Sequence, residues 1–163
     1  MGQYYYVINI DKKQYLHAHK FGDGLKLLEF GSSGGGTMCG LALLLADGNN
    51  RGGGDMRSEN DLIGSWAGDR IVIGGDYADH GRFIEGKLTK EQMEEIREHF
   101  TEGYKPNTIK DLNLYHYAQA CFEDISAKVV ECMAEDSWLK EDLEKAGCVT
   151  KDGKWKDRFG GTR

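Results

Sequence analysis

The distribution of glycine most strongly limits how this chain can fold. Seventeen of its 23 glycines lie between residues 22 and 86, and few follow Lys87. Glycine destabilises the interior of a helix, whereas tight turns and left-handed backbone favour it. The sequence therefore predicts a sheet- and loop-rich part over residues 1–86, a helical part over 87–147, and a hairpin with a loose tail over 148–163.

Hydrophobic periodicity predicts the elements of both parts. Residues 3–10 and 14–20 flank a short turn and predict the two strands of a hairpin, and a β-branched run predicts a further strand over 70–73. An apolar run over 38–46 predicts a buried helix. Apolar residues at helical spacing predict three later helices, over residues 90–102, 112–134 and 136–145. The expected fold class is α+β, with a mainly antiparallel sheet in the N-terminal half and three helices in the C-terminal half, packed as a single domain over residues 1–163.

Charge and composition limit the kinds of partner. The net charge of −6 argues against a binder of duplex nucleic acid, because that function needs a basic surface. No apolar run reaches the length of about 18 residues that a membrane span needs, and no segment has the form of a signal peptide. The four cysteines lack the close spacing of zinc ligands. We therefore expect a cytoplasmic protein with reduced thiols and no membrane partner.

The stretch over residues 64–80 is the most informative part of the sequence. Its β-branched run is typical of a strand covered on both faces, and we expect Asp69 and Arg70 at its start to form a buried ion pair. Gly74 and Gly75 follow the run, and we expect them to free the backbone for a sharp turn. Functional side chains often follow a strand in this way. The polar cluster after the turn consists of Asp76, Tyr77, Asp79 and His80.

A glycine-rich loop ahead of the buried helix predicts an anion site. Main-chain N–H groups at a helix N-terminus attract phosphate, and glycine lets a ligand approach closely. Cations from other segments would add charge, and aromatic side chains would stack on a base. The expected ligand-binding residues are Lys26, Gly34, Gly35, Gly36, Thr37, Arg51, Arg57, Trp66 and Tyr77. Since the loop lacks the residue spacing of known nucleotide motifs, a flexible turn into a core helix is the alternative.

Histidines and aspartates predict a second kind of site. His17 and His19 lie two residues apart on an expected strand, so their side chains would share one face. With Asp76 they would form a metal site, because imidazoles and carboxylates bind divalent metals. A metal-dependent hydrolase would use as its catalytic set His17, His19, Asp76, Asp79 and His80. The alternatives are exposed histidines on a hairpin and a polar turn whose aspartates cap backbone groups.

Three segments of the first half share a likeness to other proteins. They are Met1-Gly2-Gln3-Tyr4-Tyr5, Gly24-Leu25-Lys26-Leu27-Leu28-Glu29 and Gly75-Asp76-Tyr77-Ala78-Asp79. Together they resemble a group of small phage and bacterial proteins of unassigned function, which implies no activity. A phage association would imply a counter-defence role, through sequestering or degrading a nucleotide messenger or through blocking a host defence protein.

These patterns favour three functions in order. The first is the binding of a small phosphate-bearing ligand, most simply a nucleotide, because glycine-rich backbone, local cations and aromatic residues occur together in an acidic chain. The second is a metal-dependent hydrolase, such as a phosphodiesterase, for which a divalent metal would be the cofactor. The third is an inhibitor that acts by protein–protein contact. No other cofactor is expected.

Overall fold

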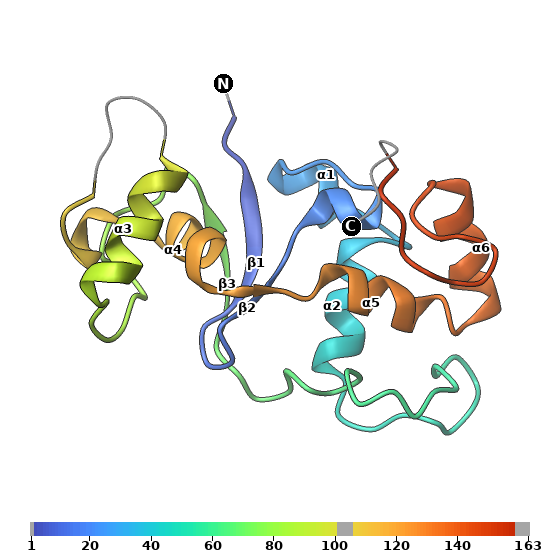
Figure 1. The fold of residues 1–163 in the computed structure, drawn as a ribbon. Coiled ribbons are helices and arrows are strands. Elements are labelled where there is room, and N and C mark those ends of the chain that lie inside the picture. The colour runs from blue at the N-terminus through green and yellow to red at the C-terminus, as the bar shows by residue number, and fades with distance from the viewer. Residues whose placement is uncertain (1, 101–105, 159–163) are drawn as a thin grey trace.

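A four-stranded sheet forms the centre of the protein, and helices cover both of its faces (Figure 1). The computed structural model describes residues 2–100 and 106–158. The strands are β1 (Tyr5–Asn9), β2 (Gln14–Leu16), β3 (Ile71–Gly75) and β4 (Glu123–Asp124), in the spatial order β3-β1-β2-β4. β1 pairs antiparallel with both β2 and β3, whereas β4 pairs parallel with β2.

Six α-helices in the described residues surround the sheet. They are α1 (Leu27–Gly31), α2 (Thr37–Leu45), α3 (Lys90–His99), α4 (Leu114–Cys121), α5 (Ser126–Met133) and α6 (Ser137–Lys145), with the two 3-10 helices η1 (Ala18–Phe21) and η2 (Ile109–Asp111). α3 and α4 pack on one face of the sheet, and the other four α-helices lie on the opposite face (Figure 1). None of the helices in the described part of the chain is both long and apolar enough to cross a membrane.

β1 separates two hydrophobic cores because its side chains alternate between the faces of the sheet. Val7 belongs to one core, which also contains Leu44 of α2 and Val129 of α5. Ile8 belongs to the opposite core, with Leu114 of α4. Each of these side chains is almost fully inaccessible to solvent. β-branched residues on both faces suit a central strand, and this fixes β1 as the middle of the molecule.

The predicted mixed α/β fold with an N-terminal sheet is confirmed in outline, whereas the prediction of three C-terminal helices is wrong. The helix expected over residues 112–134 is interrupted after Cys121, because the next residues pair with β2 as β4. Asp124 then accepts a hydrogen bond from the main-chain N–H of Ser126 (2.9 Å), and α5 begins. The end of the helix expected over 90–102 and the tail after residue 158 lie outside the described residues.

The strand expected over residues 14–20 ends early, at Leu16. The main-chain N–H of His17 donates to the hydroxyl of Ser126 (2.7 Å) instead of continuing the sheet. The N–H of Lys20 then donates to the carbonyl of His17 (3.0 Å), which closes the first turn of η1. His17 and His19 therefore do not share one face of a strand, and that expectation is wrong.

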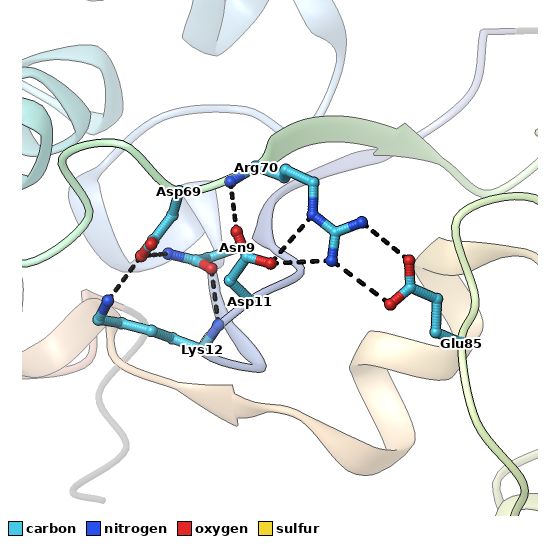
Figure 2. Close-up of polar contacts among 6 residues, drawn as sticks. All are labelled: Asn9, Asp11, Lys12, Asp69, Arg70 and Glu85. Carbon is cyan, nitrogen blue, oxygen red and sulfur yellow. Dashed lines mark hydrogen bonds and ion pairs between the residues drawn. The ribbon is translucent and has the colours of Figure 1, made fainter.

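The start of β3 is fastened to the hairpin between β1 and β2 (Figure 2). Arg70 donates its main-chain N–H to Asp11 (2.7 Å), and its guanidinium lies 2.8 Å from the carboxylates of both Asp11 and Glu85. Asp69 binds Lys12 instead, at 2.7 Å. The buried pair expected between Asp69 and Arg70 is therefore wrong, because the two side chains have different partners and 57% of the Arg70 side chain is exposed.

β3 is an edge strand, not the doubly covered strand that its sequence predicts. No further strand lies beyond it among the described residues, and 40% of the surface of Ile73 is exposed. Gly74 and Gly75 belong to the strand itself and have no positive φ, so they do not make the expected sharp turn. The turn comes one residue later, where the N–H of Ala78 donates to the carbonyl of Gly75 (3.1 Å).

Candidate functional site

A cavity of about 240 Å³ lies beside β3 and the segment that follows it. We call residues 76–85 the strap, because this segment leaves β3 at Gly75 and returns to its first end, beside Arg70. We call the cavity the edge pocket. Its lining residues are Val72, Ile73, Gly74, Gly75, Ala78, Asp79, Arg82, Phe83 and Leu114.

Two contacts between β3 and the strap lie at opposite ends of the strand. At its carboxyl end, the turn made by the hydrogen bond from Ala78 to Gly75 connects strand and strap directly. At its amino end, Glu85 of the strap binds Arg70 at 2.8 Å (Figure 2). Strand and strap are therefore joined at both ends of β3.

Ile73 is one of the strand residues that line the edge pocket. The N–H of Ile10 donates to the carbonyl of Arg70 (3.0 Å), and the N–H of Asp76 donates to the carbonyl of Tyr4 (2.9 Å). In an antiparallel ladder, hydrogen-bonded pairs alternate with non-bonded pairs, so these two bonds set the pattern between β1 and β3. In this pattern Ile73 points its N–H and C=O away from β1. Within residues 2–100 and 106–158, neither group has a hydrogen-bond partner.

Gly74 brings β3 close to the start of α4. A Cβ atom at this position would lie 2.9 Å from Cδ1 of Ile8 and 3.8 Å from Cδ2 of Leu114. The first distance is shorter than real Cβ contacts, so a side chain at position 74 would displace the end of the buried Ile8 side chain. Gly74 therefore adds no side chain to the pocket, and Leu114 contributes an apolar surface to the lining.

The strap supplies a cation and an aromatic ring to the edge pocket. The guanidinium of Arg82 lies 4.7 Å from the ring centre of Phe83, which is cation–π geometry. Phe83 has a φ of +64°, an uncommon conformation for a bulky residue. The N–H of Gly81 donates to the carbonyl of Leu112 (2.7 Å) and ties the strap to the segment before α4. In the described chain Arg82 has no carboxylate within ion-pair distance, although Asp79 lines the same pocket.

The glycine loop before α2 is closed by a carboxylate of the protein itself. Thr37 donates both its main-chain N–H (2.8 Å) and its hydroxyl (2.7 Å) to Oδ2 of Asp23. Gly34, Gly35 and Gly36 line a shallow cavity together with Asp23 and Asp142, and no lysine or arginine belongs to that lining. An anion entering this cavity would meet two carboxylates, so the geometry offers it no electrostatic attraction.

The structure brings two of the predicted metal ligands near each other. The rings of His17 and His19 lie 5.2 Å apart, centre to centre. Asp76 accepts a hydrogen bond from the main-chain N–H of Tyr4 (2.9 Å) at the far edge of the sheet, while Asp79 and His80 are exposed on the strap. In the described part of the chain, no group of three His, Cys, Asp or Glu side chains is arranged to hold a metal ion.

A cluster of aromatic side chains packs α4 against the sheet. The rings of Tyr6 and Tyr115 stack at 4.2 Å, and the Tyr6 hydroxyl accepts a hydrogen bond from the Gln119 side chain (3.3 Å). Burial raises the pKa of both phenols, so both are protonated at neutral pH. Burial also lowers the pKa of His116, against the opposing effect of the Asp76 carboxylate. These are properties of a packed core with paired polar tips.

The other predicted ligand-binding residues do not meet at the glycine loop. Lys26, Arg51 and Arg57 are exposed, and none of the three lines the loop's cavity. Trp66 is fully buried and donates its indole N–H to a glutamine of β2 (2.8 Å), so neither ring face is open to a base. Tyr77 is 70% exposed on the strap, outside the lining of the edge pocket.

Sequence reasoning did not select Arg82, Phe83 or Asp23. A signal for the first two was present, since a cation and an aromatic residue lie between Gly81 and Gly86, directly after the polar cluster. Glycines on both sides are typical of a loop that presents side chains. Asp23 carried no such signal, because its capping role depends on a contact with a residue 14 positions away.

Comparison with known proteins adds no assignment. No family model matches the chain, and no curated protein or solved structure matches it either. The resemblance to small phage and bacterial proteins therefore stays a prediction. Function has to be argued from the geometry of the edge pocket and its surroundings.

Proposed function

We propose that this chain binds a small phosphate-bearing ligand, most simply a nucleotide, in the edge pocket. The observation that carries the proposal is the position of Arg82 in the lining of a cavity that also has apolar and main-chain walls. A guanidinium recognises phosphate through charge-assisted hydrogen bonds, and apolar walls with a few polar groups are typical of ligand sites. The cavity, about 240 Å³ in volume, suits one ring system better than a large ligand.

Electrostatics favour the edge pocket over the glycine loop. The N-terminus of α2 already receives the Asp23 carboxylate, whereas Arg82 has no ion-pair partner among the described residues. A phosphate at Arg82 would therefore gain a charge partner without displacing one of the protein's own. With a net charge of −6 over the whole chain, such a local cation matters more than overall charge for an anionic ligand.

Two alternatives stay predictions. A metal-dependent hydrolase would need ligands beyond the pair His17 and His19, since no group of three is found in the described residues. An inhibitor that contacts another protein, such as a host defence protein, would need a contiguous exposed apolar surface. The most exposed large apolar side chains are Leu28 in α1, Tyr77 in the strap and Trp138 in α6, three segments that are far apart in the sequence.

A titration with three proteins tests the proposal. Isothermal calorimetry with mono-, di- and cyclic nucleotides would be run on the wild type, on Arg82→Gln and on the matched control Arg57→Gln. We expect at least one nucleotide to bind the wild type, with affinity about tenfold lower in Arg82→Gln because a charged hydrogen bond is lost. Arg57→Gln should bind like the wild type. Absence of binding by every nucleotide at millimolar concentration, or a loss in Arg57→Gln alone, would contradict the proposal.

A further inference from the structure

We infer that the edge pocket takes the base of the nucleotide, and that the main-chain N–H and C=O of Ile73 recognise this base through two hydrogen bonds. The inference rests on the proposed function, because it states which part of that ligand fills the cavity. It adds a specificity determinant that carries no side-chain chemistry.

β3 carries two main-chain groups, the N–H and C=O of Ile73, that have no hydrogen-bond partner in the described chain. Ile73 lines the edge pocket, and its N–H and C=O point away from β1 without a partner in the described chain. One residue of an edge strand thus offers a donor and an acceptor side by side, as it would to a neighbouring strand. The edge of a nucleobase carries an acceptor beside a donor, which is the complementary arrangement.

The lining of the cavity suits a flat ring. Gly74 presents no side chain, and Leu114 and Phe83 supply apolar surface around it. Apolar and aromatic surfaces in a small cavity favour a flat ring system, because stacking and burial act over the whole face of the ring.

An extended peptide, which is the other kind of ligand that pairs with edge strands, does not suit the edge pocket. A peptide that adds a strand must run past both ends of β3. The turn between Gly75 and Ala78 lies at one end, and the contact between Arg70 and Glu85 lies at the other. A single ring fits between these two contacts, whereas a continuous chain would have to pass both of them.

The two charged groups of the lining then fall to the rest of the nucleotide. Asp79 is exposed, and its carboxylate can accept hydrogen bonds that the hydroxyls of a ribose donate. It repels phosphate, so the phosphate belongs at Arg82. The base would thereby lie in the cavity, with the sugar at the exposed Asp79 and the phosphate at the exposed Arg82.

Amide signals of nitrogen-15-labelled protein measure the inference directly. The probes are the four ribonucleosides, which lack phosphate, their 5′-monophosphates, and ribose 5-phosphate, which lacks a base. We expect a nucleoside to shift the amide signal of Ile73 and to slow its hydrogen exchange by about tenfold, as a new hydrogen bond does. The amide of Ile10, which donates to the carbonyl of Arg70 in the same ladder and does not line the pocket, is the internal control and should change little.

Two proline variants provide a matched pair. Ile73→Pro removes an N–H that makes no bond to β1, so an edge strand tolerates it. Ile71→Pro removes an equivalent outward N–H that does not line the pocket. We expect nucleoside affinity to fall about tenfold in Ile73→Pro and to persist in Ile71→Pro. If neither variant folds, the wild-type amide measurement decides alone.

The outcomes separate the inference from the proposed function. Binding of ribose 5-phosphate as tight as that of the nucleotides, with no response of the Ile73 amide to any nucleoside, overturns the inference and leaves the phosphate site in place. A lack of response to every probe overturns both. A nucleoside response at Ile73 that survives Arg82→Gln supports the inference, since the base would then bind without the phosphate contact.

Discussion

Glu85 and Arg70 are joined by two hydrogen bonds, from Nη1 to Oε1 at 2.8 Å and from Nη2 to Oε2 at 3.4 Å (Figure 2). The same guanidinium also binds Asp11 in the hairpin, through Nε at 3.0 Å and Nη2 at 2.8 Å. One arginine therefore links the strap, the start of β3 and the hairpin. The edge pocket depends on this link, because it holds the returning end of the strap against the strand.

Loss of the contact between strap and strand should loosen the strap without unfolding the protein. In Glu85→Gln we expect the main-chain amides of residues 81–85 to exchange with deuterium about two- to fivefold faster, the range that an exposed ion pair supports. Glu123→Gln, which breaks an exposed pair with Lys128 away from the strap, is the control and should leave these amides unchanged. Identical rates in both variants and the wild type would show that Glu85 does not hold the strap.

The hairpin side of the same arginine gives a pH dependence. The main-chain N–H and guanidinium of Arg70 hold the pKa of Asp11 below its ordinary value of 3.8. A carboxylate with a lowered pKa stabilises the folded state above its unfolded pKa, and this contribution is lost as the pH falls through the folded pKa. The thermal midpoint of Asp11→Asn should therefore lie below that of the wild type at neutral pH.

The difference between the two midpoints should be constant from about pH 7 to about pH 5 and shrink below about pH 4. Asp47→Asn, at an exposed carboxylate, should show no such difference. A difference between Asp11→Asn and the wild type that persists unchanged to about pH 2 would contradict the role of Asp11.

Gly74 gives a packing prediction. Its missing Cβ would lie 2.9 Å from Cδ1 of Ile8, whereas a Cβ at Gly34 would meet nothing within 4 Å. Gly74→Ala should lower the free energy of unfolding by about 1 kcal/mol, because the added methyl group displaces Cδ1 of the buried Ile8 side chain in β1. Gly34→Ala should be close to neutral. Urea denaturation measures both values, and equal stability of the two variants would contradict the packing argument.

Asp23 gives a capping prediction. Because Thr37 donates its N–H and its hydroxyl to this carboxylate, Asp23→Ala should destabilise the protein by about 1 kcal/mol, as the loss of other helix caps does. Asp142→Ala changes the second carboxylate of the same cavity. It should cost less stability, because the Asp142 side chain makes no hydrogen bond to α2 among the described residues. Chemical denaturation compares them, and the reverse order would contradict capping by Asp23.

Features that depend on neighbouring residues could be predicted from the sequence. The sequence from Thr89 to Gln92 matches a capping box, which predicts a helix start, and the side chain of Thr89 accepts from the N–H of Gln92 (3.1 Å). The strand character of β1 follows from its run of aromatic and β-branched residues, and Val7 and Ile8 lie in opposite cores. Such patterns are set within a few residues of the chain, so they carry over to the structure.

Features that depend on distant contacts could not be predicted. Glu123 and Asp124 have low strand propensity, and they join the sheet because the N–H of Glu123 reaches the carbonyl of Lys13 (3.0 Å). β3 has the composition of a covered strand, yet its edge position is decided by the order of strands in the sheet. The lining of the edge pocket follows the same rule, because Arg82 and Phe83 lie outside the stretch over residues 64–80 and reach β3 only through the return of the strap.

Photolabelling tests the central claim most directly, because it reports the position of the bound base. The wild-type protein would be irradiated with 8-azidoadenosine 5′-monophosphate and with 5-azidouridine 5′-monophosphate, digested, and mapped by mass spectrometry. We expect labels within residues 71–86 or at Leu114, which unmodified nucleotide suppresses and Arg82→Gln reduces. Labels confined to residues 31–58, or labels that unmodified nucleotide does not suppress, would contradict a nucleotide site in the edge pocket.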